Sequence, residues 1–156
     1  MSRMVLSQEA HIVSIIPPQG SSGATIDSDV FSMKDASHVT IILTVGAQAG
    51  AASFTVVECD DFVPNNTTAI GYREAKEVTT GGDTLAALTA IASTGTATAA
   101  TSNTMYVIEI DSEDMSEDYP NLQLKLADLD NTTYVSAVAI LTGLCFAGDT
   151  NRTQIA

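Results

Sequence analysis

The chain has 156 residues, of which 45% are hydrophobic and only 5% aromatic, and it contains no tryptophan. This length suits one domain, with a core built from Val, Ile, Leu and Ala. Asp and Glu number 19 against 6 Lys and Arg, a formal net charge of -13, and so acidic a surface argues against nucleic-acid and membrane partners because it repels phosphate groups and anionic lipid.

The two ends of the chain are polar and carry little hydrophobic pattern. The opening MSRMVLSQEA lacks the apolar run of a signal peptide. No stretch approaches the roughly 18 apolar residues of a membrane-spanning helix. We therefore expect synthesis in the cytoplasm and three parts: an N-terminal arm over 1–10, a single β domain over 11–147 and a C-terminal tail over 148–156.

Strand patterns begin directly after the arm. His11–Ile16 (HIVSII) predicts a first strand that stops at Pro17 and Pro18, because proline donates no hydrogen bond to a ladder. The following segment is rich in turn residues and then leads through three apolar positions toward a short strand: Ile26, Val30 and Phe31.

The most informative stretch is the pair of β-branched runs His38–Val45 and Ser53–Cys59, joined by GAQAGAA. Each run has the length of a strand, and the small, polar connection predicts a hairpin. The second run alternates, which places its residues on two faces. One face holds Phe54, Val56 and Glu58, and the other holds Ser53, Thr55, Val57 and Cys59.

The middle of the chain has weaker signals. DDFVPNN, residues 60–66, reads as a loop, and 67–80 reads as a strand interrupted by AKE and ended by the turn Gly81-Gly82-Asp83. In Thr84–Ala92 the apolar spacing predicts a short helix that Asp83 can cap. Ser93–Ser102 (STGTATAATS) is uncharged and of low complexity, and it predicts a loop that packs on a neighbouring element.

The final third contains three further strand patterns. Thr104–Asp111 is a strand, and Leu122–Leu129 alternates between a buried and a wet face. Tyr134–Phe146 is long and mostly apolar, which favours a central strand buried on both sides. The predicted fold class is all-β: an antiparallel β-sandwich, jelly roll or small barrel of about eight strands, with at most one short helix near 84–92.

Few residues suggest catalysis. His11 and His38 both begin strands, and neither accompanies a GxSxG motif or a nucleophilic cysteine. The glycines match neither the Walker A pattern nor GxGxxG: Gly46, Gly50, Gly81 and Gly82. We assign no catalytic residue, no cofactor-binding residue and no metal ligand, and we expect a protein that is not an enzyme and has no cofactor.

The acidic run Asp111–Asp118 is the one cluster with the chemistry of a ligand site. Dense carboxylates can hold Ca²⁺, but the run lacks the central Gly and the terminal Glu of an EF-hand. A solvated loop is the favoured reading, with Asp60 and Asp61 as residues that could join a cation site in space. Paired carboxylates of a glycosidase would want aromatic sugar platforms, which this composition does not favour.

Two cysteines, Cys59 and Cys145, belong to no CxxC pair and no ligand cluster. Two small buried hydrophobes are the favoured interpretation, and a disulfide between two strands is the alternative. Glycosylation-type triplets are read only as turn residues in a chain with no secretion signal: Asn65, Asn66, Asn131 and Asn151.

Four segments together resemble small structural proteins of tailed-bacteriophage virions. They are VTIILTVGAQAGAASFTVVECDD, TTGGDT, TMYVIEID and NTTYVSAVAILTGLCFAGD, within Val39–Asp149. In that class a hairpin of the form LxVGAxAGAxxFTVxEsDD precedes a final VSAVAIL strand. The class often ends in Arg-Tyr-rich segments, whereas this chain has LQLKLAD.

The resemblance implies a capsid decoration (cement) protein or another accessory head protein. Such a protein binds the outside of an icosahedral phage head, contacts the major capsid protein and forms homotrimers, so the expected location is the exterior of the virion. The alternatives are a head–tail connector or tail component, a Ca²⁺-dependent or carbohydrate-binding β-sandwich module, and an enzyme whose active site lies in the loops.

Overall fold

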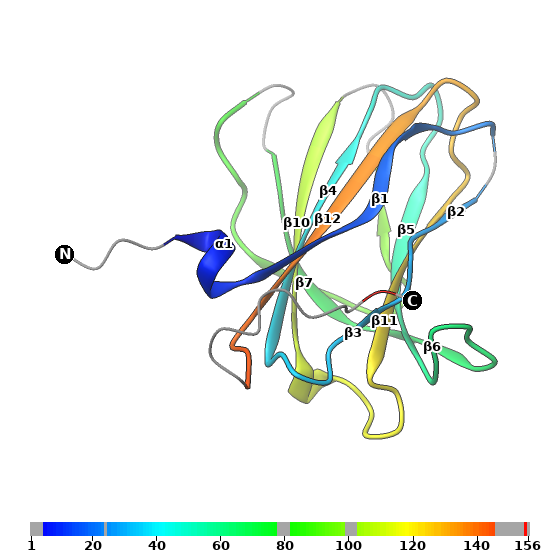
Figure 1. The fold of residues 1–156 in the computed structure, drawn as a ribbon. Helices are drawn as coiled ribbons and strands as arrows, with labels where there is room; N and C mark the ends of the chain where they lie inside the picture. Colours follow the sequence, from blue (N-terminus) through cyan, green and yellow to red (C-terminus); the bar gives the residue numbers. More distant parts are fainter. Residues whose placement is uncertain (1–4, 24, 78–81, 99–102, 146–154, 156) are drawn as a thin grey trace.

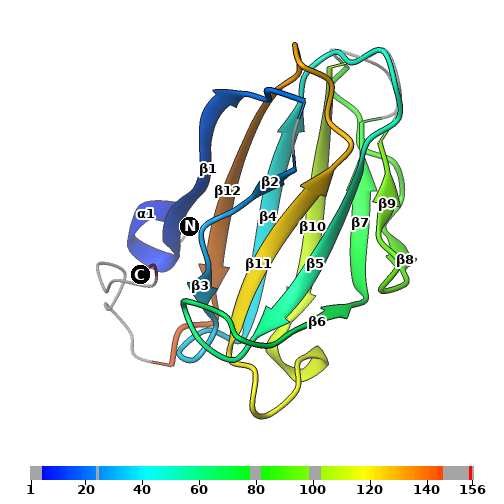
Figure 2. The same ribbon diagram turned by 90° about the vertical axis from the view of Figure 1, so that its right-hand side faces the viewer.

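The computed structural model describes residues 5–23, 25–77, 82–98, 103–145 and 155, and these form two packed antiparallel sheets (Figures 1 and 2). Sheet A has the order β1 (His11–Gly20), β12 (Tyr134–Thr142), β4 (His38–Val45), β10 (Thr104–Asp111), β7 (Tyr72–Lys76), β8 (Thr89–Ile91). Sheet B has the order β2 (Ile26–Asp27), β11 (Asn121–Ala127), β5 (Ser53–Cys59), β6 (Thr67–Ile70), with β3 (Phe31–Ser32) on β11 and β9 (Thr96–Ala97) on β5.

The predicted all-β sandwich is confirmed, but the described residues form twelve strands instead of about eight. The predicted short strand through Ile26 and Phe31 forms two pieces, β2 and β3, and the predicted strand after residue 66 forms β6 and β7. β8 and β9 are additional strands of three and two residues. Such pieces are too short to show an alternating pattern, and their pairing depends on the longer strand beside them. Within the described part of the chain, no helix is long and apolar enough to cross a membrane.

The predicted helix over Thr84–Ala92 is wrong. Leu85 pairs with Glu77, the Ala86 N–H donates to the Lys76 carbonyl over 2.8 Å, and β8 pairs with β7. A nine-residue segment forms only a marginal helix by itself, so strand pairing prevails. The helical segments of the described chain are α1 (Leu6–Glu9), inside the predicted arm, and the 3-10 turn η1 (Ser112–Asp114).

The strands of the central pair begin and end where the sequence predicts, but the hairpin is wrong. β4 lies between β12 and β10 in sheet A, whereas β5 lies between β11 and β6 in sheet B. The GAQAGAA segment therefore crosses from one sheet to the other. Asp130 holds this crossing because its carboxylate accepts the N–H of Gly50 over 3.0 Å and also that of Ala49.

The core lies between the sheets. Alternate residues of each long strand point inward, and the leucines of β11 are fully buried, which confirms its predicted wet and dry faces. Aromatic side chains contribute more than their number suggests. Phe54 from sheet B packs edge-on against Tyr106 at 5.1 Å and beside Tyr72 at 6.1 Å between ring centroids, so an aromatic contact joins the two sheets.

Two further strand predictions need correction. β12 is not central and not buried on both sides, since it lies second from the edge and its residues alternate between buried and half-exposed. β1 does not stop at Pro17 but continues to Gly20 through two register shifts. An edge strand tolerates proline because one side of its ladder has no partner strand.

The segment after residue 66 divides at Gly71 instead of at AKE. β6 belongs to sheet B and β7 to sheet A, so the chain changes sheets at this glycine. A Cβ there would lie 2.9 Å from the Ile91 carbonyl oxygen, and the corner therefore needs a residue without a side chain. Ala75 and Lys76 of the AKE run belong to β7.

Some predicted features lie outside the described residues: the turn residue Gly81, residues 99–102 of the low-complexity segment, Phe146, Asn151 and most of the tail over 148–156. Of that tail, Ile155 is described. It pairs with Phe31 next to sheet B and packs against the core. The described part of the low-complexity segment includes β9, which packs on β5 as a neighbouring element.

Candidate functional site

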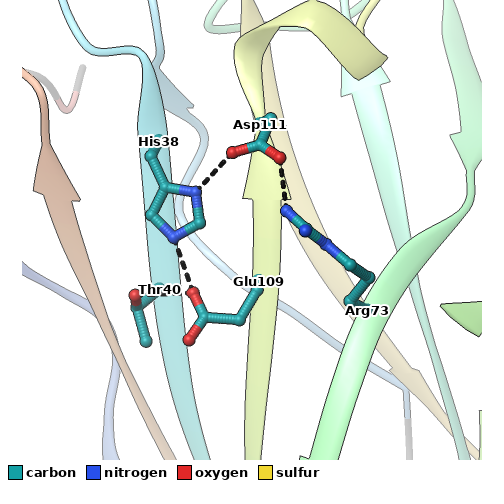
Figure 3. Close-up of polar contacts among 5 residues, drawn as sticks. All are labelled: His38, Thr40, Arg73, Glu109 and Asp111. Carbon is teal, nitrogen blue, oxygen red and sulfur yellow. Dashed lines mark hydrogen bonds and ion pairs between the residues drawn. The ribbon is translucent and has the colours of Figure 1, made fainter. Parts of the chain in front are cut away.

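The most organised polar cluster lies on the outer face of sheet A, near the end where β4 begins. Strand register explains it: Asp111 lies opposite His38, and Glu109 lies opposite both Thr40 on one side and Arg73 on the other. The residues between them point into the core, so these five share the outward face (Figure 3). We call them the His38 cluster.

Direct contacts join the whole cluster (Figure 3). The His38 ring contacts two carboxylates: Nδ1 lies 2.7 Å from Asp111 Oδ1, and Nε2 lies 2.7 Å from Glu109 Oε2. The Thr40 hydroxyl donates to Glu109 over 2.7 Å, and the Arg73 guanidinium pairs with the other oxygen of Asp111. Three adjacent strands, β4, β10 and β7, are therefore linked by side chains as well as by backbone.

The contacts shift the protonation equilibria of two groups. Partial burial lowers the pKa of His38, but the hydrogen bonds to Asp111 and Glu109 outweigh it, so the pKa lies above the ordinary 6.5. The hydrogen bond from His38, followed by the charge of Arg73, lowers the pKa of Asp111 below its ordinary 3.8. Both shifts favour the charged forms, as expected for an ion pair.

This geometry suits structure better than proton transfer. A general base needs a free nitrogen that can reach a substrate proton. Both ring nitrogens of His38 contact carboxylates of the same chain. The sequence pointed to His38 as a strand-start residue, but it missed Glu109, Arg73 and Thr40 as its partners. Alternation within the two predicted strands could have shown which residues share a face of each strand. The sequence gives no sign of the register that brings the two strands side by side.

The acidic run 111–118 leads from sheet A to sheet B. Its Ser116 donates from N–H and hydroxyl to the buried Glu58 carboxylate over 2.8 and 2.7 Å. Asp60, considered as a possible companion of this run, instead accepts hydrogen bonds from Asn65 and Asn66 in its own loop. In the ranges described, no group of three or more His, Cys, Asp or Glu is placed to hold a metal ion.

An open hollow of about 290 Å³ lies between this connection and the turn before β4. Apolar or weakly polar side chains make up much of its wall, among them Met33, Met115, Tyr119 and Cys145. Ser37 and Ser112, which neighbour the His38 cluster in the chain, also line it. The hollow therefore adjoins the cluster at the same end of the sandwich.

The cysteines are both free, so the alternative of a disulfide is wrong. Cys59 is buried as predicted, next to Val30, Val57 and Phe62, and burial raises its pKa to about 11. Cys145 is exposed, contrary to the prediction, because β12 ends at Thr142 and the chain has left the sheet by this position.

The remaining candidates of the sequence lie in connections or at strand ends. His11 begins β1. Gly46 and Gly50 belong to the crossing between the sheets, where the Gly46 N–H donates to the Tyr134 carbonyl over 2.7 Å. The asparagines Asn65, Asn66 and Asn131 lie in connections between strands, as the sequence predicts.

Among the described residues, five of the seven exposed large hydrophobic side chains lie at the two edges of sheet A, the exceptions being Val63 and Tyr134. At one edge Val5 directly precedes α1, Leu6 begins α1 and Ile12 lies on β1, with exposed fractions between 36% and 47%. At the other edge Leu85 pairs with Glu77 and Leu88 directly precedes β8, with exposed fractions of 43% and 50%. Figure 2 shows β1 and β8 on opposite sides of the molecule.

No protein-family model and no curated protein matches the chain. Among solved structures, the SPBc2 prophage-derived protein YomS is similar at 7% identity and a TM-score of 0.45, over 85% of this chain and 93% of that one. The Gt strain of infectious bursal disease virus gives 9% identity and a TM-score of 0.22, over 84% of this chain and 39% of that one. At these TM-scores neither likeness indicates a function for this chain.

Proposed function

We propose that this chain is a non-enzymatic structural protein of a tailed-bacteriophage particle. It binds the outside of the head, contacts the major capsid protein and stabilises the lattice as a decoration protein. The sequence resemblance to phage virion proteins gives the class. The observation that carries the proposal is the pair of apolar edges at opposite sides of sheet A.

Two different apolar edges suit contact between copies. A head-to-tail contact joins one surface of a subunit to another surface of the next, and it closes into a ring when the rotation allows. The six strands of sheet A alternate in direction, so the two edge strands, β1 and β8, run in opposite directions. If β8 of one copy lies next to β1 of another, the two strands are antiparallel and the sheet continues from one copy into the next. A homotrimer is the proposed ring.

The charge of the chain makes such apolar contacts important. With a formal net charge of -13, copies repel one another and any acidic assembly on which they lie. Burial of apolar side chains supplies attraction that does not depend on charge. Several copies held in one ring then bind a lattice with avidity, which stabilises the lattice by mass action.

Replacing both Leu85 and Leu88 by serine tests the proposal, with Val63→Ser as the matched control. Val63 is 80% exposed but lies between β5 and β6 of the other sheet. We expect the unaltered chain and V63S to form trimers in light scattering and to co-sediment with purified phage heads. The L85S/L88S variant is expected to remain monomeric and to bind heads at least tenfold more weakly, a loss of about 1.4 kcal/mol, while its circular dichroism spectrum stays that of the unaltered chain.

Two results would contradict the proposal. One is a monomer for the unaltered chain at concentrations of tens of micromolar together with no co-sedimentation. The other is assembly of L85S/L88S that equals that of V63S. A ring that binds purified necks or tails and not heads would instead favour the head–tail connector or tail component.

A further inference from the structure

The His38 cluster places one imidazole ring between two carboxylates, and this arrangement fixes the protonation state of the ring. Each nitrogen lies 2.7 Å from a carboxylate oxygen. An ionised carboxylate only accepts hydrogen bonds, and a neutral imidazole has only one N–H to donate. While both carboxylates are ionised, both contacts are hydrogen bonds only when both nitrogens carry protons, that is, when His38 is an imidazolium.

The cluster also marks where the acidic connection leaves sheet A. His38 follows the turn that contains Ser37, and Asp111 directly precedes η1. The Ser112 N–H donates to the Ser37 carbonyl over 2.9 Å, directly beside the His38–Asp111 contact. The hollow at this end is lined by both Ser37 and Ser112, so the same contacts hold two of its walls together.

We propose that His38 is a proton-operated clip, which in its protonated form fastens the start of the acidic connection, at Ser112, to the turn before β4 and in its neutral form loosens this attachment, while Ser116 stays bonded to Glu58. This inference is independent of the proposed function, because it uses only contacts within one chain. The hollow is then fixed in shape while His38 carries its proton, and its wall loosens as the pH rises through the folded pKa of the ring.

The charged groups around the His38 ring determine how the clip responds to pH. β10 presents Glu109 and Asp111, and β7 presents Arg73, which pairs with Asp111. From β12 the residue opposite His38 is Thr142, which does not titrate. Loss of the imidazolium proton leaves two carboxylates facing a ring that satisfies only one of them, with Arg73 as the remaining cation of the cluster.

The pH window follows from the directions of the shifts. Because folding raises the pKa of His38, its contribution to stability is complete below the ordinary value of 6.5 and is lost as the pH rises through the folded value. Asp111 has a lowered pKa, so its contribution is present above 3.8 and is lost as the pH falls through the folded value. The clip is therefore closed between these limits.

Nuclear magnetic resonance of the unaltered protein tests the proposal directly. We expect the ¹⁵N shifts of both His38 ring nitrogens to be those of an imidazolium at pH 6.5, and the titration midpoint in the folded protein to exceed that of the same residue in urea. As the pH rises through that midpoint, the hydrogen-exchange protection factor of the Ser112 amide should fall. The fall should be roughly tenfold for each unit by which folding raises the pKa of His38.

Variants separate the clip from general pH effects. His38→Gln should remove the fall in Ser112 protection, whereas the matched control His11→Gln should retain it. Asp111→Asn and Glu109→Gln should each lower the His38 midpoint. A neutral His38 tautomer at pH 6.5, or a folded midpoint at or below that in urea, would overturn the proposal, and both are measured without any variant.

Discussion

Replacement of Phe54 by alanine is expected to lower the free energy of unfolding by about 3–5 kcal/mol. The Phe54 ring is fully buried and packs against Tyr72 and Tyr106 of the opposite sheet. Its removal takes away apolar burial and two aromatic contacts, and it leaves a cavity between the layers that rigid sheets cannot close. Urea unfolding followed by circular dichroism measures the change.

Phe62→Ala is the matched control, because it makes the same chemical change outside the main core. Phe62 is only partly buried, against the small outer cluster that contains Cys59. A loss of about 1–2 kcal/mol is expected there. Equal losses for the two variants would contradict the view that the contact between Phe54 and sheet A holds the layers together.

Gly95→Ala is expected to destabilise the fold by at least about 2 kcal/mol. Gly95 has a φ of +81°, and a Cβ there would lie 2.2 Å from the Phe54 carbonyl oxygen and 2.5 Å from the Thr55 side chain. The new methyl group would meet backbone that cannot rotate away. The turn before β9 would have to lift from β5.

Gly50→Ala provides the comparison for this prediction. Its nearest neighbour would be an Asp130 oxygen at 3.7 Å, which is an ordinary contact. We expect a change within about 0.5 kcal/mol. Thermal unfolding of both variants decides the point, and a Gly95 variant as stable as the Gly50 variant would show that the turn adapts without cost.

The longer strands could be predicted because each shows an alternating apolar pattern within its own residues. Thr104–Asp111 and the pair His38–Val45 and Ser53–Cys59 have the predicted bounds, since alternation of large apolar residues needs no knowledge of neighbours. The hairpin could not be predicted safely. A seven-residue connection is long enough either to return within a sheet or to cross to the other sheet, and the choice depends on where β10 and β12 pair.

The His38 cluster shows a second limit of the sequence. His38 and Thr40 alternate on one strand, and Glu109 and Asp111 alternate on another, so each pair could be placed on a face. That the two faces coincide depends on strand order and register between segments about 70 residues apart. The arrangement of Arg73 adds a third strand to the same problem.

The exposed edges also depend on strand order. Leu85 and Leu88 suggested a helix face by their spacing, whereas in the structure they precede an edge strand. The strand order therefore makes these two leucines candidate contacts between subunits, whereas their spacing alone made them candidate packing residues of a helix. Ile12 gains its significance only because β1 is the opposite edge of the same sheet.

The number of copies of this chain per purified phage particle, measured by quantitative mass spectrometry against the major capsid protein, tests the central proposal most directly. A decoration protein covers the lattice, so we predict a fixed number of copies of this chain per copy of the major capsid protein, of the same order of magnitude. Washing that strips the outer proteins from the heads should lower this ratio. Absence from purified particles, or a ratio so low that only one ring per particle fits, would contradict it.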